Sequence, residues 1–160
     1  MLTIRPAEER DKFAVWQIIK EVLAAGDTYT DTDSSEEAMD EYWSSSEKHH
    51  YVAVSNDVVV GTFSLRANQP GRGSHIGNAS YMVSSAARGQ GVGKQIALWS
   101  LDEARRLGFT AMQFNFVVKS NEKAVALWQK IGFAIVGEIP DAFDHAENGL
   151  TNAYIMYRKL

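Results

Sequence analysis

The residues best suited to chemistry lie in a glycine-rich segment, Arg88-Gly89-Gln90-Gly91-Val92-Gly93-Lys94. An apolar run ends near Val83 just before it, and apolar residues at roughly helical spacing follow it. The first amides of a helix lack intrahelical partners and the helix dipole is positive there, so glycine backbone lets an anion approach closely. Arg88 and Lys94 add two positive charges. The segment therefore predicts a phosphate-binding turn; the alternative is a glycine-rich connection without a ligand.

The spacing of the glycines decides which kind of phosphate-binding turn this is. A P-loop requires a glycine where this sequence has Arg88. The dinucleotide fingerprint Gly-x-Gly-x-x-Gly also fails, because its last position falls on Lys94 or Ile96. The segment does fit the pattern Arg/Gln-x-x-Gly-x-Gly/Ala, with Arg88, Gly91 and Gly93 in the defined positions.

A second motif follows about thirty residues later, Asn121-x-x-Ala124-x-x-Leu127-Trp128-x-x-x-Gly132-Phe133. The GNAT family of N-acetyltransferases carries a similar Asn-x-x-Ala-x-x-Leu-Tyr-x-x-x-Gly-Phe pattern at a similar distance from its coenzyme A pyrophosphate loop. The glycine-rich segment resembles that loop. Two motifs in the right order, each in its expected strand-helix setting, are more specific than either alone. The sequence is therefore identified as a member of this family.

The resemblance covers nearly the whole chain and implies one acetyltransferase domain over residues 1–160. Its implied fold class is α/β (α+β), with the GNAT fold: a mixed, mostly antiparallel central sheet of about seven strands, flanked by about four helices. The sheet is expected to splay between the fourth and fifth strands. The pantetheine arm of acetyl-CoA, the implied cosubstrate, would enter this gap, and no metal is implied.

The implied coenzyme contacts come from the strand before the loop, the loop itself and the last helix. Free backbone groups of Met82 and Val83 would pair with the pantetheine arm, as in strand addition. The amide of Val83 or of its neighbour would point at the thioester oxygen and stabilise the negative charge that develops there. Asn121 would cap its helix and also bond to the arm, although capping alone would explain it. The full set is Met82, Val83, Arg88, Gly89, Gln90, Gly91, Val92, Gly93, Lys94, Asn121, Ala124 and Trp128.

One residue departs from the family pattern. Many members have a tyrosine that can protonate the departing thiolate, where this chain has Trp128. An indole N–H is a donor but not a useful acid. Either another residue protonates the sulfur, or none is needed because a thiolate of pKa about 8.5 is already a fair leaving group. We favour the second alternative.

A narrower resemblance concerns the acceptor. The segment from Asn68 to Ala79, the pair Phe114-Asn115 and the ending Ala153-Tyr154-Ile155-Met156-Tyr157 resemble the fungal acetyltransferases of azetidine-2-carboxylate and other proline analogues, and their bacterial relatives. Asn78 and Asn115, expected to be buried on adjacent strands, would orient the acceptor as catalytic residues, unless backbone edges satisfy them.

Further acceptor contacts are implied with less support from the pattern. Tyr29 and the pair Tyr42-Trp43 lie where family members border the acceptor pocket, although Trp43 would equally suit a plain core. His75 would serve as a base or simply be solvated. The candidate acceptor contacts are Tyr29, Trp43, His75 and Tyr154.

Seven strands and four helices must position these residues. Periodicity and turn residues predict strands over residues 2–5, 51–54, 58–65, 78–83, 110–118, 134–139 and 153–157. Helices are predicted over residues 11–25, from a capping box at Ser34, over 92–107 and over 121–131. The first helix is expected to bury Phe13, Trp16, Ile19 and Leu23. Residues 141–149 are expected to form a polar loop.

The amino-acid composition excludes or disfavours several classes of function. A net charge of −4 and a pI near 5.5 argue against a nucleic-acid partner. The chain has no cysteine, which excludes a disulfide framework, a thiol nucleophile and an acetyl-cysteine intermediate. It shows no signal-peptide pattern and no apolar run long enough for a membrane, so the cytoplasm is the expected location.

The function expected from these observations is transfer of an acetyl group from acetyl-CoA directly to the amine of a small molecule or amino acid. The partners are acetyl-CoA and that amine, with a homodimer left open and no membrane partner. Transfer to a protein N-terminus or lysine is the enzymatic alternative. A coenzyme A-binding sensor without catalysis is an alternative of a different class, motivated by the missing tyrosine.

Overall fold

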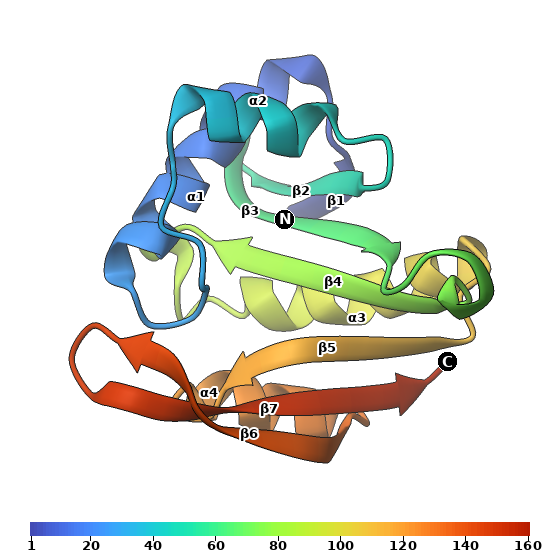
Figure 1. Ribbon diagram of the computed structural model, residues 1–160. Helices are drawn as coiled ribbons and strands as arrows, with labels where there is room; N and C mark the ends of the chain where they lie inside the picture. The colour runs from blue at the N-terminus through green and yellow to red at the C-terminus, as the bar shows by residue number, and fades with distance from the viewer.

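One seven-stranded sheet organises the chain (Figure 1). The computed structural model describes all 160 residues. The strand order is β1-β2-β3-β4-β5-β7-β6 and all neighbours are antiparallel except β4 and β5, so the predicted mixed fold is confirmed. The strands are β1 (Leu2–Pro6), β2 (His49–Ser55), β3 (Val58–Ala67), β4 (Ile76–Val83), β5 (Ala111–Val118), β6 (Ala134–His145) and β7 (Gly149–Lys159).

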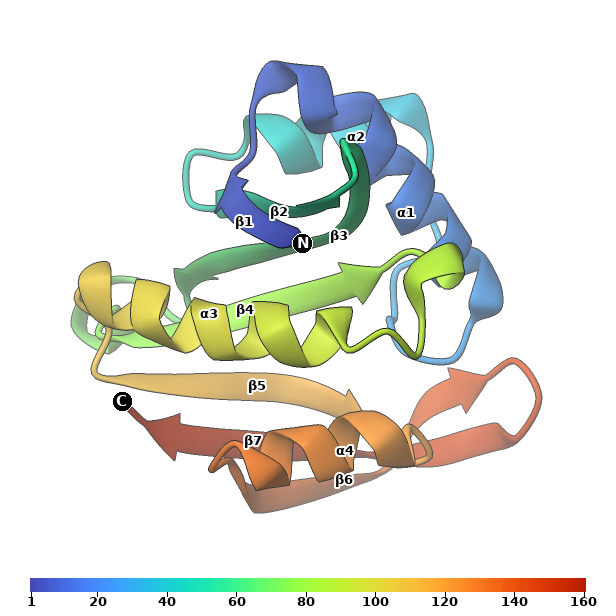
Figure 2. The same ribbon diagram turned by 180° about the vertical axis from the view of Figure 1, so that it is seen from behind.

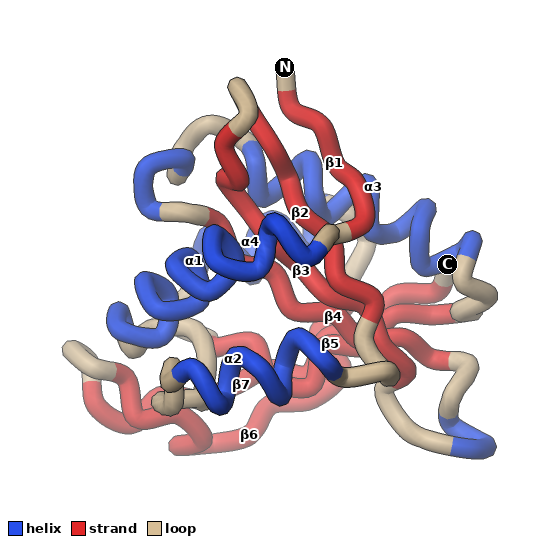
Figure 3. Tube along the Cα trace, turned by 90° about the horizontal axis from the view of Figure 1, so that it is seen from above, coloured by secondary structure: helices blue, strands red, loops and turns tan.

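Four helices cover the two faces of the sheet (Figures 1 and 2). They are α1 (Lys12–Ala25), α2 (Glu36–Ser44), α3 (Val92–Arg106) and α4 (Glu122–Lys130). The first two lie on one face and α3 and α4 on the other, and the view from above in Figure 3 shows α1 and α2 side by side over the strands. Short 3₁₀ turns at Glu9–Asp11, Gly71–Gly73 and Ser85–Ala87 connect the elements.

Three helix ends follow the capping rules in the sequence. Ser35 caps α2 by accepting the Ala38 amide, one residue later than the predicted start at Ser34. Asn121 caps α4 by accepting the Ala124 amide at 3.4 Å, so its predicted capping role is confirmed. Gly26 ends α1 with a left-handed φ of 64°.

The sheet splays between β4 and β5, as predicted. These strands are parallel neighbours only at Ile76↔Ala111 and Gly77↔Met112. The two strands approach closely at this point, because a Cβ on Gly77 would lie 2.8 Å from the Met112 sulfur and 2.9 Å from the Phe109 ring. Beyond Gly77 the strands diverge toward their carboxyl ends (Figure 2). The rest of β4 therefore pairs with β3 alone and leaves one backbone edge facing the gap.

The end of the chain forms a longer hairpin than predicted. The polar loop expected over residues 141–149 is wrong, because β6 continues to His145 and pairs with β7 as far as His145↔Gly149. A bulge between Ile139 and Phe143 interrupts the register, and Asp141 adopts a positive φ of 49° there. Phe143 is buried beyond the bulge and anchors the extension. Because of the bulge, apolar and polar residues do not alternate regularly here, and this alternation is the pattern from which a strand is predicted.

The buried face of α1 also differs from the prediction. The helix buries Val15, Ile18 and Val22, whereas Phe13 is 66% exposed. Trp16 and Ile19, which were expected to be core, pack only partly against the smaller core cluster. Apolar residues cover more than one stripe of this helix, so helical spacing alone fits two faces.

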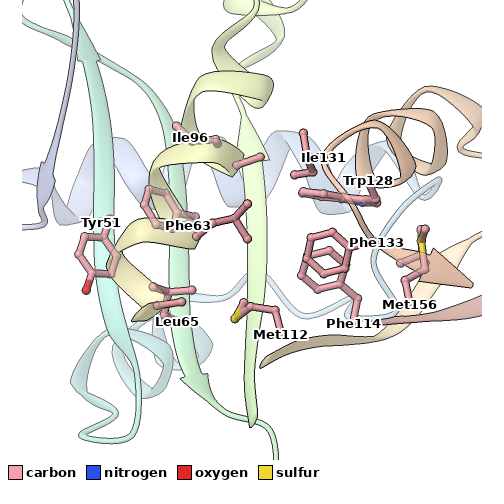
Figure 4. Close-up of a cluster of buried hydrophobic side chains, with 14 of the residues drawn as sticks. Tyr51, Phe63, Leu65, Ile96, Met112, Phe114, Trp128, Ile131, Phe133 and Met156 are labelled. Atoms are coloured by element: carbon pink, nitrogen blue, oxygen red, sulfur yellow. The ribbon is translucent and has the colours of Figure 1, made fainter. Parts of the chain in front are cut away.

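The main core lies between the sheet and helices α3 and α4 (Figure 4). Phe114 of β5 stacks on Phe133 with ring centroids 4.4 Å apart and contacts Trp128 of α4 at 4.6 Å. Figure 4 shows these three rings facing one another, next to Ile131 and Met156. This aromatic cluster fixes α4 against the carboxyl half of β5, directly below the splay.

Two buried carboxylates, which the sequence did not single out, tie helices to the sheet. Asp11 accepts two hydrogen bonds from Arg5, at 2.7 and 2.9 Å, and these bonds hold the pKa of its carboxyl below the usual range. Glu103 accepts two from Arg106, at 2.8 and 2.6 Å, and one from the Tyr51 hydroxyl at 2.8 Å. The Arg106 bonds likewise lower the pKa of Glu103.

These lowered pKa values predict acid-sensitive stability. A carboxyl whose pKa is lower in the folded protein contributes stability above its unfolded pKa, about 3.9 for Asp and 4.3 for Glu, and loses it as pH falls through the folded pKa. We expect the melting temperature to fall steeply below about pH 5. In the Asp11→Asn, Glu103→Gln double variant the melting temperature should fall less steeply as the pH is lowered. Equal slopes in thermal unfolding of the two proteins between pH 5 and pH 2 would contradict this assignment.

Candidate active site

The glycine-rich segment forms an open turn at the start of α3. Gly89 and Gly91 both have a φ of 77°, and a Cβ at either position would meet nothing within 4 Å. Gly91 is the residue before the helix, and no side chain caps it, so the first amides of α3 remain free to bind an anion. Neither Arg88 nor Lys94 forms an ion pair within the chain. The turn has the geometry and charge that a pyrophosphate requires.

The backbone edge of β4 at the splay belongs to Tyr81 and Val83. The Tyr29 hydroxyl donates to the Tyr81 carbonyl at 2.7 Å and accepts its amide at 2.8 Å, so these groups point away from β3. In an antiparallel pair the N–H and C=O groups of successive residues point alternately toward the partner strand and away from it. The Ser84 amide donates to the Val60 carbonyl, so the backbone groups of Ser84 face β3. The backbone groups of Met82 therefore face β3. Its predicted backbone contact with the coenzyme is wrong for this reason, although its side chain lines the cavity described next.

A cavity of about 490 Å³ lies between β4, β5 and α4, beside the turn. Predicted coenzyme contacts from three elements meet in its wall: Met82, Val83, Arg88, Asn121, Ala124 and Trp128. The glycines and Lys94 lie at the turn itself, at the end of this cavity. Trp128 is buried, with its ring 5.0 Å from that of Tyr81, so it forms part of the apolar wall.

A second cavity, of about 700 Å³, lies on the other side of the splay between α1, α2 and the sheet. The two cavities share the wall residues Thr28, Tyr29, Ala79, Met82, Phe114 and Phe116. Tyr29 thus stands where they meet, and burial raises the pKa of its phenol, which keeps it neutral. Two ligands, one in each cavity, would therefore come together beside Tyr29.

The two predicted asparagines line this second cavity but are not buried as expected. Asn78 is half-buried, and its side-chain oxygen accepts the Ala79 amide at 2.8 Å. Asn115 is exposed; it donates to Asn68 at 2.7 Å and accepts from Gln113 at 3.0 Å. Asn78 directly follows the last residue of β4 that pairs with β5, and Asn115 lies three residues beyond the last paired residue of β5, so both lie near the closed end of the splay.

Three other predicted acceptor contacts lie outside both cavities. Trp43 stacks on His50, with ring centroids 5.4 Å apart, and donates to Glu9. His75 is exposed in the connection before β4. Tyr154 lies on β7 beneath the Lys119 ammonium, which is 5.6 Å from its ring centroid. The structure therefore brings Tyr29, but not these three side chains, to the second cavity.

The pair Tyr42-Trp43 was implied to border the acceptor pocket, and of these two residues only Tyr42 lines the second cavity. Sequence reasoning missed two cationic residues of this cavity. Lys48 and Arg66 supply positive charge from β2's leading turn and from β3. No local pattern marks these residues, because the cavity joins segments that are distant in sequence.

The sheet splays beside a glycine-rich helix start that has no side-chain cap, and two cavities meet at the edge of β4. This arrangement is typical of an acyltransferase that uses a coenzyme A thioester. The sequence profile of the Acetyltransferase (GNAT) family matches residues 16–133. The chain belongs to this family of acetyltransferases.

Similar proteins agree with this assignment. A GCN5-related N-acetyltransferase from Kribbella flavida is 40% identical with a TM-score of 0.93, over 99% of this chain and 98% of that chain. N-acetyltransferase aca1 of Schizosaccharomyces pombe is 38% identical over 98 residues, which are 61% of this chain and 47% of that protein. This chain thus spans less than half the length of the curated relatives it matches.

A more distant structure, YncA from Salmonella typhimurium with its cofactor acetyl-CoA, shares the fold at 22% identity. Its TM-score is 0.87, over 100% of this chain and 94% of that chain. In the present structure no group of three or more His, Asp or Glu side chains is arranged to hold a metal ion. None of the helices combines the length and apolar composition needed to cross a membrane.

Proposed function

We propose that the acetyl acceptor is the amine of a small molecule or amino acid. The observation that carries this proposal is the 700 Å³ cavity that meets the coenzyme cavity at the edge of β4. A pocket of this size, closed on one side by α1 and α2, suits a small ligand. Within this class we favour cyclic amino acids of the proline-analogue type, on the similarity of the segments around Asn78 and Asn115.

The chain's own residues would hold acetyl-CoA from both ends. The free amides at the start of α3, with Arg88 and Lys94, would bind the pyrophosphate. The edge of β4 at Tyr81 and Val83 would pair with the pantetheine arm, and Asn121 would add a side-chain contact. Bound acetyl-CoA supplies a thioester whose carbonyl carbon the amine attacks; the C–S bond then breaks and the thiolate leaves.

The β4 edge would also stabilise the reaction. An amide there, from Tyr81 or Val83, would donate to the thioester oxygen as it becomes an anion, which is worth about 2.7–4 kcal/mol for one well-placed donor. Trp128 offers no acid to the leaving sulfur, and a thiolate of pKa about 8.5 can leave without one. The amine loses its proton to solvent.

The asparagines would act by positioning. Their amides cannot serve as bases, but they can hold the neutral amine, or a water that relays its proton, in line with the carbonyl. We expect Asn78→Ala and Asn115→Ala each to lower kcat/KM for the acceptor about tenfold or more, while the Kd for CoA stays the same. The rate should rise with pH toward the amine's own pKa. A plateau near the pKa of an ordinary histidine that is lost in His75→Ala would instead identify a histidine base.

Tyr29 would compete with the coenzyme in the free enzyme. Its hydroxyl holds the two backbone groups of Tyr81 that face the splay, and acetyl-CoA would need the same edge. We expect Tyr29→Phe to bind CoA more tightly, by up to about tenfold, because the free protein loses a hydrogen bond worth about 1 kcal/mol. Calorimetry measures this change. Weaker binding in Tyr29→Phe would show that the hydroxyl assists the coenzyme instead.

Two alternative functions remain: one has a different acetyl acceptor, and the other has no acceptor at all. A protein N-terminus or lysine would have to enter the same cavity as an extended peptide, and a sensor would bind CoA without releasing thiol from acetyl-CoA. The single-domain organisation, the homodimer and the cytoplasmic location stay predictions.

A further inference from the structure

A row of two cations and an amide crosses the floor of the acceptor cavity. Arg66 of β3 is the register partner of Asn78 of β4. On its other side β3 pairs with β2, and the first pair is His49↔Leu65. Lys48 precedes His49 and Arg66 follows Leu65, so the same register places Lys48 opposite Arg66. All three side chains line the acceptor cavity. Neighbours in such a row share one face of the sheet, so their polar ends can converge.

Neither cation is in direct contact with a carboxylate of the chain. No carboxylate forms an ion pair with Lys48 or Arg66, and neither side chain makes a hydrogen bond. Lys48 is half-buried with its ammonium 4.6 Å from the Tyr42 ring centroid. Burial, and then the neighbouring Arg66 charge, lower the pKa of Lys48, and the nearby carboxylates of Asp31 and Glu47 offset part of this effect. Arg66 itself is exposed, so the two side chains place neighbouring positive charges on one wall of the cavity, and an anion bound between them would favour the charged form of Lys48.

The acidic residues of the cavity lie on a different wall. Asp31 and Asp33 belong to the connection between α1 and α2, and Glu41 belongs to α2. Asp33 already accepts the Ser35 amide at 2.9 Å, beside the start of α2. The sheet side of the cavity is thus positive and the helix side negative, which suits a ligand that carries both charges.

We propose that Lys48 and Arg66 bind an anionic group of the acceptor, so that the substrate is a small amine that also carries a carboxylate or a similar anion. This inference rests on the proposed function. The row at Asn78 lies three residues before Tyr81, about 10 Å along β4 at 3.3 Å per residue. The long side chains of Lys48 and Arg66 shorten that span, and Asn78 stands between the anion and the reacting amine.

The test compares each acid with its uncharged counterpart. Glycine, β-alanine, 4-aminobutyrate, L-proline and L-methionine are offered as acetyl acceptors beside their carboxamides, and kcat/KM is taken from thiol release. We expect the best acid to exceed its carboxamide at least tenfold. Lys48→Met and Arg66→Gln should each reduce this preference several-fold, and Arg66→Glu should abolish it. Equal kcat/KM values for the acids and their carboxamides, in an enzyme that acetylates both, would contradict the anion site.

Matched controls separate a local charge effect from a general one. Arg72→Gln and Lys159→Met remove exposed cations that line neither cavity, and the preference for acids should not change in them. If none of these compounds releases thiol, then small-amine transfer itself is wrong for them, and calorimetry on the CoA complex still decides the anion site. Binding of an acid that is lost in Arg66→Gln supports the site, and binding of acid and carboxamide with equal affinity contradicts it.

Discussion

Gly91→Asp is expected to weaken CoA binding at least about a hundredfold, or about 2.8 kcal/mol, while the protein stays folded. The left-handed φ of 77° at Gly91 suits glycine, and aspartate tolerates this region better than most side chains. The new carboxylate would lie beside the free amides of α3 and accept their hydrogen bonds as an N-cap. It would therefore occupy the anion site and repel the pyrophosphate at the same time.

Calorimetric titration with CoA measures this effect. Gly91→Asn is the matched control, because it has the same shape without the charge and should bind CoA more weakly than the wild type but better than Gly91→Asp. Arg88→Ala should weaken binding less than Gly91→Asp, since most donors at the turn are backbone amides. Unchanged CoA affinity in a folded Gly91→Asp protein would remove the phosphate assignment from this turn.

Phe114→Ala is expected to lower the free energy of unfolding by about 3–5 kcal/mol. Phe114 is 5% exposed, and its ring contacts those of Phe133, Trp128 and Tyr81. Truncation would leave a void in this cluster and would also join the two cavities, since Phe114 lines both. We therefore expect a large loss of acetyl transfer even at temperatures where the variant is folded.

Phe13→Ala is the matched control for this prediction. Phe13 is 66% exposed on α1, so its truncation should change stability by less than about 0.5 kcal/mol. Denaturant unfolding of both variants gives the comparison. A large loss in Phe13→Ala, or a loss below about 1 kcal/mol in Phe114→Ala, would mean that α1 or β5 packs with another face inward.

The contrast between these phenylalanines shows what the sequence could predict. The turn at Gly91 and the cap at Asn121 depend on residues within a few positions of each other, so their patterns predicted them correctly. The inward face of α1 depends on which neighbour packs against it, and helical spacing fitted two stripes equally well. The strand β6 was predicted too short because a bulge near Asp141 breaks the alternation.

The acceptor cavity shows why the rest could not be predicted. Tyr29 reaches Tyr81 across 52 residues of sequence, and Lys48 meets Arg66 and Asn78 only through strand register. Neither arrangement leaves a local pattern. The resemblance to known acetyltransferases placed Tyr29 near the acceptor, but its hydrogen bonds to the β4 edge depend on how that loop folds over the splay.

The most direct test of the proposed direct transfer is thiol release from acetyl-CoA with a panel of small amines, with the product identified by mass spectrometry. The prediction is that thiol appears only when a suitable amine is present, in equal amount with an N-acetylated product, and that Gly91→Asp abolishes both. A protein that binds CoA with measurable affinity yet releases no thiol above background with any amine or peptide would contradict catalysis and favour the sensor.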